Sequence, residues 1–406
     1  MNARWLGVFA LGASLAACSN AGSLPSAIPG SASQTANSRA ASSHAFTALY
    51  SFKGAPDGAY PLAPLVRVGG ELYGTTSQGG NANANGNGAI FKMGLGGSEK
   101  VLYSFTGSPD GEFPQAGLLA MKGVLYGTTP NGGATGNGTV FTSTKAGSEH
   151  AAYSFMGSSD GASPASGLLN VGGTLYGTTL GGGGSNCNSN AGCGTIFKID
   201  SSGSETVIYR FQGGSDGSTP SANLTYSHGS FYGTTFLGGG SACNFRGCGT
   251  VYKVDSSGAE SVVHAFKGGS DGANPSAGVI VVRGTLYGTT SSGGGNRNHG
   301  TVFEIAHSGK ERVIHKFTGA PDGADPEAGI LAIGTMLYGT TYAGGSDDFG
   351  TVFQMDATGS ETVLHSFTNG ADGANPSASL IAVKNKLLGT AKNGGSGFGT
   401  VYSIEL

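Results

Sequence analysis

Charged residues are scarce in this chain, and their scarcity excludes several classes of protein. Asp, Glu, Lys and Arg make up 11% of the 406 residues, and the formal net charge is -3. A nucleic-acid-binding protein would show clustered Lys and Arg and a basic pI, so we expect no nucleic-acid partner. Disorder requires low hydrophobicity with high net charge, whereas 38% of these residues are hydrophobic. The composition therefore allows a packed core.

A helical pattern is also missing outside the first twenty residues, where no stretch keeps the 3.6-residue apolar period of an amphipathic helix. What the chain has instead is glycine, at 77 positions. The Gly residues separate short runs rich in Val, Ile, Tyr, Phe and Thr, a pattern typical of strands and hairpins. The sequence therefore predicts an all-β protein.

The N-terminus has the features of an export signal. Arg4 precedes the apolar stretch Trp5–Leu15, and Leu15-Ala16-Ala17-Cys18 resembles the lipobox of bacterial lipoproteins. We expect a signal peptide over residues 1–17 and a diacyl group on Cys18, the only expected membrane contact. The alternative is an ordinary signal peptide with an incidental Cys.

The segment after Cys18 predicts where the protein is held. Residues 18–44 consist almost entirely of Ala, Ser, Gly, Asn and Pro, the composition of a flexible tether. Ser19, rather than Asp, follows the Cys and implies sorting to the outer membrane if the host is Gram-negative. We expect the domain formed by residues 45–406 to be lipid-anchored at the cell envelope.

One unit recurs seven times from residue 45 to residue 406. It reads Y-S-F-x-G-x-x-D-G-x-x-P, an apolar stretch, L-Y-G-T-T, a Gly-rich loop and G-T-V-F. The repeated Asp residues are Asp57, Asp110, Asp160, Asp216, Asp271, Asp322 and Asp372. A fixed period of this length indicates a solenoid or a propeller.

Spacing within the unit separates rigid from variable parts. Every repeated Asp precedes the Gly of L-Y-G-T-T by 17 residues, as from Asp57 to Gly74, and the Gly of G-T-V-F precedes the next Asp by 22, as from Gly88 to Asp110. Only the Gly-rich span between the two motifs changes in length. Fixed lengths are expected where strands pair, and variable lengths where a loop meets solvent.

Each unit predicts four short strands, A to D. In the second copy these are Gly117–Met121, Val124–Thr129, Thr139–Thr142 and His150–Phe155. The repeat region starts with a D-type strand, Thr47–Phe52, and stops after a C-type strand, Thr400–Ile404. This phase predicts a seven-bladed β-propeller of four-stranded blades, closed by the N-terminal strand joining the last blade. The alternative, a β-solenoid, would need polar capping repeats, and none is visible.

In such a propeller the variable B–C loops and the D-to-A linkers that carry D-G-x-x-P lie on one face, the default binding surface. For the repeated Asp we favour a structural role, accepting backbone N–H groups in a turn. The alternative is seven calcium or ligand sites. We expect no metal and no cofactor.

Four cysteines lie in the two longest B–C loops, Cys187 with Cys193 and Cys243 with Cys248. Outside the cytoplasm thiols tend to oxidise, so we expect two disulfides within the loops. Bridges between the two loops and a Cys₄ zinc site are the alternatives.

No catalytic constellation is recognisable. His264, His315 and His365 replace the Tyr of strand D and are interpreted as packing variants. Departures specific to single loops are the candidates for recognition, and they comprise Phe245, Arg246, Arg297, His299, Asp347 and Asp348.

The motifs L-Y-G-T-T, G-G and G-T-V-F, as in Leu125–Thr129, Gly132-Gly133 and Gly138–Phe141, resemble the GloVer (Gloeobacter/Verrucomicrobia) repeat. The resemblance implies an exported, surface-displayed repeat protein with no established activity, so it supplies no catalytic residues.

Our leading interpretation is a monomeric, non-enzymatic scaffold that binds a glycan or a protein at the cell envelope. The alternatives are a polysaccharide hydrolase or lyase, which needs repeat-breaking carboxylates in the axial funnel, and a purely structural envelope protein. Fold analogy cannot choose among these.

Overall fold

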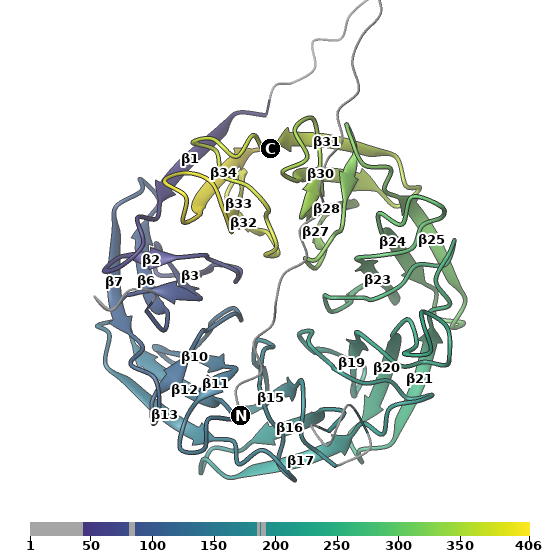
Figure 1. The fold of residues 1–406 in the computed structure, drawn as a ribbon, viewed down its shortest axis with the longest axis horizontal. Coiled ribbons are helices and arrows are strands. Elements are labelled where there is room, and N and C mark those ends of the chain that lie inside the picture. Colours follow the sequence, from purple (N-terminus) through teal and green to yellow (C-terminus); the bar gives the residue numbers. More distant parts are fainter. Residues whose placement is uncertain (1–43, 81–85, 185–186, 188–191) are drawn as a thin grey trace, which may run out of the picture. The chain divides into compact units, whose positions relative to one another are not determined.

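The described part of the chain forms one ring of seven blades (Figure 1). The computed structural model describes residues 44–80, 86–184, 187 and 192–406. These belong to a single compact unit, His44–Leu406. The expected signal peptide, Cys18 and nearly all of the tether lie outside the described residues. Within the described residues, no helix is long and apolar enough to cross a membrane.

Each blade is a four-stranded antiparallel sheet. Blade 1 consists of β3 (Val66–Val68), β4 (Glu71–Thr76), β6 (Ala89–Gly94) and β7 (Glu99–Ser104). Blade 2 consists of β9 (Leu119–Met121), β10 (Val124–Thr129), β12 (Thr139–Thr144) and β13 (Glu149–Ser154). Blade 3 consists of β14 (Leu169–Val171), β15 (Thr174–Thr179), β16 (Thr195–Ile199) and β17 (Glu205–Arg210).

The next three blades repeat this order. Blade 4 consists of β18 (Thr225–Ser227), β19 (Ser230–Thr235), β20 (Thr250–Asp255) and β21 (Glu260–Ala265). Blade 5 consists of β22 (Ile280–Val282), β23 (Thr285–Thr290), β24 (Thr301–Ile305) and β25 (Glu311–Lys316). Blade 6 consists of β27 (Leu331–Ile333), β28 (Met336–Thr341), β30 (Thr351–Asp356) and β31 (Glu361–Ser366).

Blade 7 joins the two ends of the repeat region, as the strand phase predicts. It consists of β32 (Ile381–Val383), β33 (Lys386–Ala391), β34 (Thr400–Glu405) and β1 (Phe46–Ser51). The N-terminal strand β1 pairs antiparallel with β34, with Phe46 opposite Ile404. The predicted seven-bladed propeller is therefore confirmed, and the solenoid alternative is wrong.

Hydrogen bonds from one blade to the next follow the same rule around the ring. The first Thr of L-Y-G-T-T donates its hydroxyl to a carbonyl of the following linker, as from Thr75 to Ala116 at 3.3 Å. The last of these bonds runs from Thr390 to Ala63 at 3.2 Å. It joins residues at opposite ends of the sequence, so it closes the ring with the contact that joins every other pair of blades.

Aromatic pairs fill the core between blades. The Phe that ends strand D packs edge to face against the aromatic residue of G-T-V-F in the next blade, as between Phe105 and Phe141, with ring centroids 5.1 Å apart. The Gly of L-Y-G-T-T makes room for that ring, because a Cβ on Gly127 would lie 2.4 Å from Cζ of Phe141. The repeated Gly and Phe thus form one packing unit.

Three short strand pairs fasten the linkers to the loops. They are β2 (Gly58–Ala59) with β5 (Gln78–Gly79), β8 (Gly111–Glu112) with β11 (Asn131–Gly132), and β26 (Gly323–Ala324) with β29 (Ala343–Gly344). In the other four blades a single bridge replaces the pair, as between Ala162 and Gly181. In every blade the D-to-A linker and the base of the B–C loop therefore lie together on one face, called the loop face below.

Candidate functional site

The repeated Asp organises the linker in every copy. In the linker before blade 2, Asp110 Oδ2 accepts the backbone N–H of Thr106 at 2.9 Å and the hydroxyl of Tyr103 at 2.8 Å. The bond from the backbone N–H four residues earlier recurs at all seven Asp residues, which are Asp57, Asp110, Asp160, Asp216, Asp271, Asp322 and Asp372. A carboxylate holding its own linker in this way shapes the loop face.

A cavity of about 400 Å³ lies on the axis of the ring and is lined by all seven linkers. The residue after each repeated Pro contributes to its wall, and the seven are Leu62, Gln115, Ala165, Ser221, Ser276, Glu327 and Ser377. Glu327 is the only ionisable residue among those lining the cavity. Glu327 is therefore a carboxylate at a channel position where the other six repeats have an uncharged residue.

A second carboxylate that the other repeats lack, Asp325, lies two residues before Glu327 in the sequence. Its backbone N–H donates to the carbonyl of His299 at 2.9 Å, and its carbonyl accepts the N–H of Tyr342 at 3.0 Å. His299 belongs to the B–C loop of blade 5 and Tyr342 to that of blade 6. The linker carrying both acids is thus held between two variable loops.

The pKa values of both carboxyls are raised. For Asp325 burial is the main cause and the charge of Asp348 adds to it, while His299 acts in the opposite sense. The side chain of Glu327 is accessible to water in the channel, yet the surrounding linkers remove enough solvent to raise its pKa, with Asp325 adding and Lys392 opposing. Lys392, from the B–C loop of blade 7, also lies over the ring of Tyr342, 5.7 Å from its centroid.

These contacts and charge interactions link ionisable side chains on the loop face of blades 5 to 7, and one of them, Glu327, lines the axial cavity. The blade 5–7 cluster consists of His299, Asp325, Glu327, Asp348 and Lys392. Two members, His299 and Asp348, belong to the recognition residues predicted from the sequence. The other three were missed, although a comparison of the residues flanking the repeated Pro would have identified the two acids.

The remaining predicted recognition residues lie elsewhere on the loops. Phe245 is 92% exposed on the blade 4 loop, where Arg246 follows it. The guanidinium of Arg297 donates to the carbonyl of Thr318 at 2.8 Å, and Asp347 is exposed beside Asp348. The six predicted residues therefore belong to three neighbouring loops rather than to one pocket.

A second depression, of about 960 Å³, lies between the linker after blade 2 and the B–C loop of blade 3. Arg210 is the one charged residue in its lining, which also includes the exposed Met156. It offers an apolar and cationic surface, unlike the axial cavity, where the one ionisable residue is the carboxylate Glu327.

Both expected disulfides are formed within their loops. Cys187 bonds to Cys193 and Cys243 to Cys248, with Cα atoms 5.1 and 5.3 Å apart. The alternatives of cross-loop bridges and a zinc site are therefore wrong. Cys193 and Cys248 are buried, which anchors the two longest loops to their blades.

The blade 5–7 cluster combines carboxyl, imidazole and ammonium groups, with the phenol of Tyr342 beside Lys392. Its member Glu327 lies in a channel that is otherwise lined by neutral residues. Such a set can both donate and accept hydrogen bonds. It suits a polar ligand with several hydroxyl groups, and its protonatable acids could also serve acid–base chemistry.

Comparisons with known proteins agree with the fold. Residues 35–191 and 243–406 match the sequence profile of the Gloeobacter/Verrucomicrobia repeat. No curated protein sequence is significantly similar to this chain. A puromycin-hydrolyzing peptidase of Mycobacterium tuberculosis has a similar structure at 9% identity, with a TM-score of 0.51 over 86% of this chain and 52% of the peptidase. A gluconolactonase of Xanthomonas campestris is 12% identical, with a TM-score of 0.42 over 89% of each chain. At 9% identity the likeness to the peptidase shows the fold alone.

Proposed function

The chain belongs to the Gloeobacter/Verrucomicrobia repeat family, and we propose that it is a non-enzymatic scaffold that binds a glycan at the cell envelope. The observation that supports this proposal is the blade 5–7 cluster. On a ring built from one repeated unit, Asp325 and Glu327 are carboxylates that the other linkers lack at these positions, and they flank the same Pro326. Functional groups on a rigid scaffold tend to be carried by loops.

The chemistry of the cluster favours a sugar over an apolar ligand. Carboxylates accept hydrogen bonds from vicinal hydroxyls, Lys392 donates, and the ring of Tyr342 offers an apolar face to a pyranose. A few placed polar groups in a concave site are the usual means of orienting a small polar ligand. A protein ligand is the other outcome that a binding screen can reveal.

The test is a glycan array of neutral and acidic oligosaccharides, followed by calorimetric titration of each hit. We expect Asp325→Asn and Glu327→Gln each to weaken binding about tenfold or more, since a charge-assisted hydrogen bond contributes about 1.5–3 kcal/mol. Glu405→Gln, an exposed change at the far end of β34, serves as the matched control and should bind like the wild type. If Asp325→Asn and Glu327→Gln bound the glycan as tightly as Glu405→Gln, the assignment of the blade 5–7 cluster as the binding site would be contradicted.

A polysaccharide hydrolase is the second candidate, and one observation favours it. The pKa of Glu327 is raised by burial, and a carboxyl with a raised pKa suits the general-acid role in glycoside hydrolysis. Release of reducing ends from a bound polysaccharide, abolished in Glu327→Gln while binding persists, would establish an enzyme. Binding without release supports the scaffold.

The envelope location is part of the proposal and depends on Cys18. A diacyl group there would hold the propeller at a membrane through the tether. We expect Cys18→Ser to move the protein from the membrane fraction to the soluble fraction after cell lysis. Equal membrane association of the variant would rule out the lipid anchor.

A further inference from the structure

Ionisable residues also meet at the outer edges of the blades, away from the loop face cluster. At six of the seven junctions the aromatic residue of strand D, the repeated linker Asp and a Glu that begins strand D of the next blade come together. We call this set a junction triad. The six triads are Tyr50/Asp57/Glu99, Tyr103/Asp110/Glu149, Tyr153/Asp160/Glu205, Tyr209/Asp216/Glu260, His264/Asp271/Glu311 and His315/Asp322/Glu361.

In the four triads with Tyr, the phenol satisfies the Asp. The Tyr hydroxyl donates to the linker Asp at 2.8–2.9 Å, as from Tyr153 to Asp160. A protonated phenol is a hydrogen-bond donor and a poor metal ligand. In these four junctions the Asp therefore has a side-chain hydrogen-bond donor, while Oε1 of each Glu is buried without a hydrogen bond.

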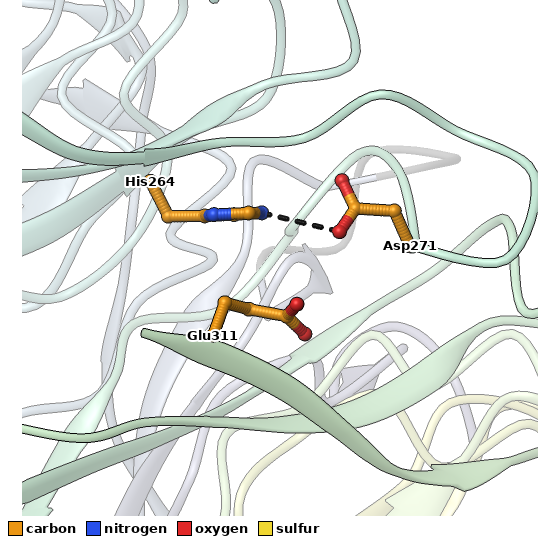
Figure 2. Close-up of side chains that lie close together, drawn as sticks. All are labelled: His264, Asp271 and Glu311. Atoms are coloured by element: carbon orange, nitrogen blue, oxygen red, sulfur yellow. Dashed lines mark ion pairs between the residues drawn. The ribbon is translucent and has the colours of Figure 1, made fainter. Parts of the chain in front are cut away.

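Two triads carry His in place of Tyr, and their donor atoms converge. His264 Nε2 lies 3.4 Å from a carboxylate oxygen of Asp271, and His315 Nε2 lies 3.3 Å from one of Asp322. With Glu311 and Glu361, each group places its three possible ligand atoms within 4.8 Å of one another. Figure 2 shows the imidazole of His264 and the carboxylates of Asp271 and Glu311 facing a common point.

The converging atoms are sheltered and unpartnered. His264 Nε2 and Glu311 Oε1 are buried without a hydrogen bond, since the 3.4 Å approach to Asp271 has poor hydrogen-bond geometry. The same holds for His315 Nε2 and Glu361 Oε1 in the second triad. The unpaired Glu oxygen also occurs in the Tyr triads, so the unpaired imidazole nitrogen is what distinguishes these two junctions. Buried polar atoms normally have a partner.

We propose that the triads His264/Asp271/Glu311 and His315/Asp322/Glu361 each bind a divalent transition-metal ion such as Zn²⁺. One imidazole nitrogen and two carboxylates are ligands that zinc accepts, at about 2.0–2.2 Å, with water filling the remaining positions. A dication neutralises two carboxylates that otherwise repel at short range. Small side-chain rotations bring ligand atoms from their present separations to the roughly 3.3 Å that tetrahedral coordination requires.

The ion would join neighbouring blades. His264 comes from β21 of blade 4 and Glu311 from β25 of blade 5, while His315 comes from β25 and Glu361 from β31 of blade 6. These strands lie at the periphery of the ring (Figure 1). The proposal is independent of glycan binding at the loop face, and either can hold without the other.

The seventh junction provides a natural control, because it has two ligands of the three. His365 Nε2 lies 3.1 Å from Asp372 Oδ2, but the position of the Glu is occupied by Phe46 of β1. The Phe46 ring stacks on His365 with centroids 3.8 Å apart. This junction should not bind the ion.

The test uses the full chain, stripped with chelator and loaded with Zn²⁺, with the metal content measured after gel filtration and the affinity by calorimetry. We expect two equivalents in the wild type, one in His264→Tyr, one in His315→Tyr and none in the double variant. His365→Tyr should keep both. Because four junctions already carry Tyr at this position, the substitutions should fold, and the melting temperature without metal checks this.

A gain of function sharpens the test. Phe46→Glu supplies the missing carboxylate beside His365 and Asp372. The position is equivalent to that of Glu361, because Phe46 pairs with Ile404 in blade 7 as Glu361 pairs with Met355 in blade 6. We expect this variant to bind three equivalents. A wild type that binds none, or a double variant that binds as much as the wild type, overturns the proposal.

Discussion

At the scale of single residues, seven repeated contacts between a Gly and an aromatic ring, five with Phe and two with Tyr, determine how tightly a blade packs on its neighbour. Gly127 lies over the ring of Phe141, which in turn meets Phe105 of the preceding blade. The position is glycine for steric reasons, because an added Cβ would meet both Phe141 and Leu118. The same contact explains why the repeat keeps Gly in the middle of a buried strand, where glycine is otherwise unfavourable.

Gly127→Ala should destabilise the propeller by about 1–3 kcal/mol, because overpacking a filled core shifts side chains or backbone. The measurement is denaturant unfolding of the variant and the wild type. Gly96→Ala is the matched control, since a Cβ there meets nothing within 4 Å, and it should change stability by less than about 0.5 kcal/mol. Equal stability of both variants would show that the Gly–Phe contact can relax freely.

The junction triads with Tyr make stability depend on pH. Burial, with the charge of Asp110 adding and the hydroxyl of Tyr103 opposing, raises the pKa of Glu149 from 4.5 to about 7. A carboxyl whose pKa is higher in the folded state contributes its full stabilisation when the pH is below its pKa in the unfolded state. That stabilisation is lost as the pH rises through its pKa in the folded state. Stability should therefore fall between about pH 5 and pH 8.

Glu149→Gln removes that ionisation while keeping the shape of the side chain. At pH 8 the variant should be more stable than the wild type by roughly 1 kcal/mol, a figure discounted for the partial exposure of the group. At pH 5, where the wild-type carboxyl is protonated, the two should nearly coincide. Melting temperatures across this range check the prediction, and parallel curves for both proteins would refute it.

At the scale of elements, β1 is the piece that turns seven repeats into a ring. It pairs with β34 and places Phe46 against His365, Phe367 and Tyr402. It thereby covers an edge that would otherwise offer unpaired N–H and C=O groups to other chains. The short pairs β2–β5, β8–β11 and β26–β29 have a different task, since they hold the bases of the variable loops.

A chain lacking residues 1–52 should lose the cooperative unfolding of the wild type and aggregate through the exposed edge of β34. Gel filtration and thermal melting test this. A chain lacking only residues 1–43, the expected signal peptide and most of the tether, is the control and should remain monomeric with an unchanged melting temperature. A monomeric chain with wild-type melting after removal of β1 would show that β34 needs no partner.

The elements also show what sequence reasoning could and could not reach. The strand Val124–Thr129 was predicted with its observed bounds, because its Val, Tyr and Thr residues favour a strand and the Lys122-Gly123 turn and the Gly-rich loop mark its two ends. Gly117 was predicted as strand but belongs to the linker that lines the channel. The two-residue strands consist largely of Gly and have no side-chain pattern to reveal them.

At the scale of the whole molecule, the seven-fold repeat builds the ring, and departures from it mark the candidate sites. The repeat and its phase predicted the architecture because blade contacts recur at fixed spacing. The junction triads were not predicted, since Asp271 and Glu311 meet only when two blades pack side by side. His264 and His315 were interpreted as packing variants of Tyr, and that interpretation omits the carboxylates that face them.

The two proposed sites lie in different parts of the molecule. The blade 5–7 cluster lies on the loop face, whereas the two His triads lie between outer strands. Ligand binding at one should therefore leave the other unchanged, and a variant that loses metal should keep its glycan.

The most direct test of the proposed function is hydrogen exchange measured by mass spectrometry, with and without the glycan selected on the array. We predict slower exchange in residues 291–300, 323–329, 342–350 and 391–399, which carry or adjoin the blade 5–7 cluster, and no change in the C–D hairpins on the opposite face. Protection confined to those hairpins, or spread evenly over the seven blades, would contradict a loop-face binding site.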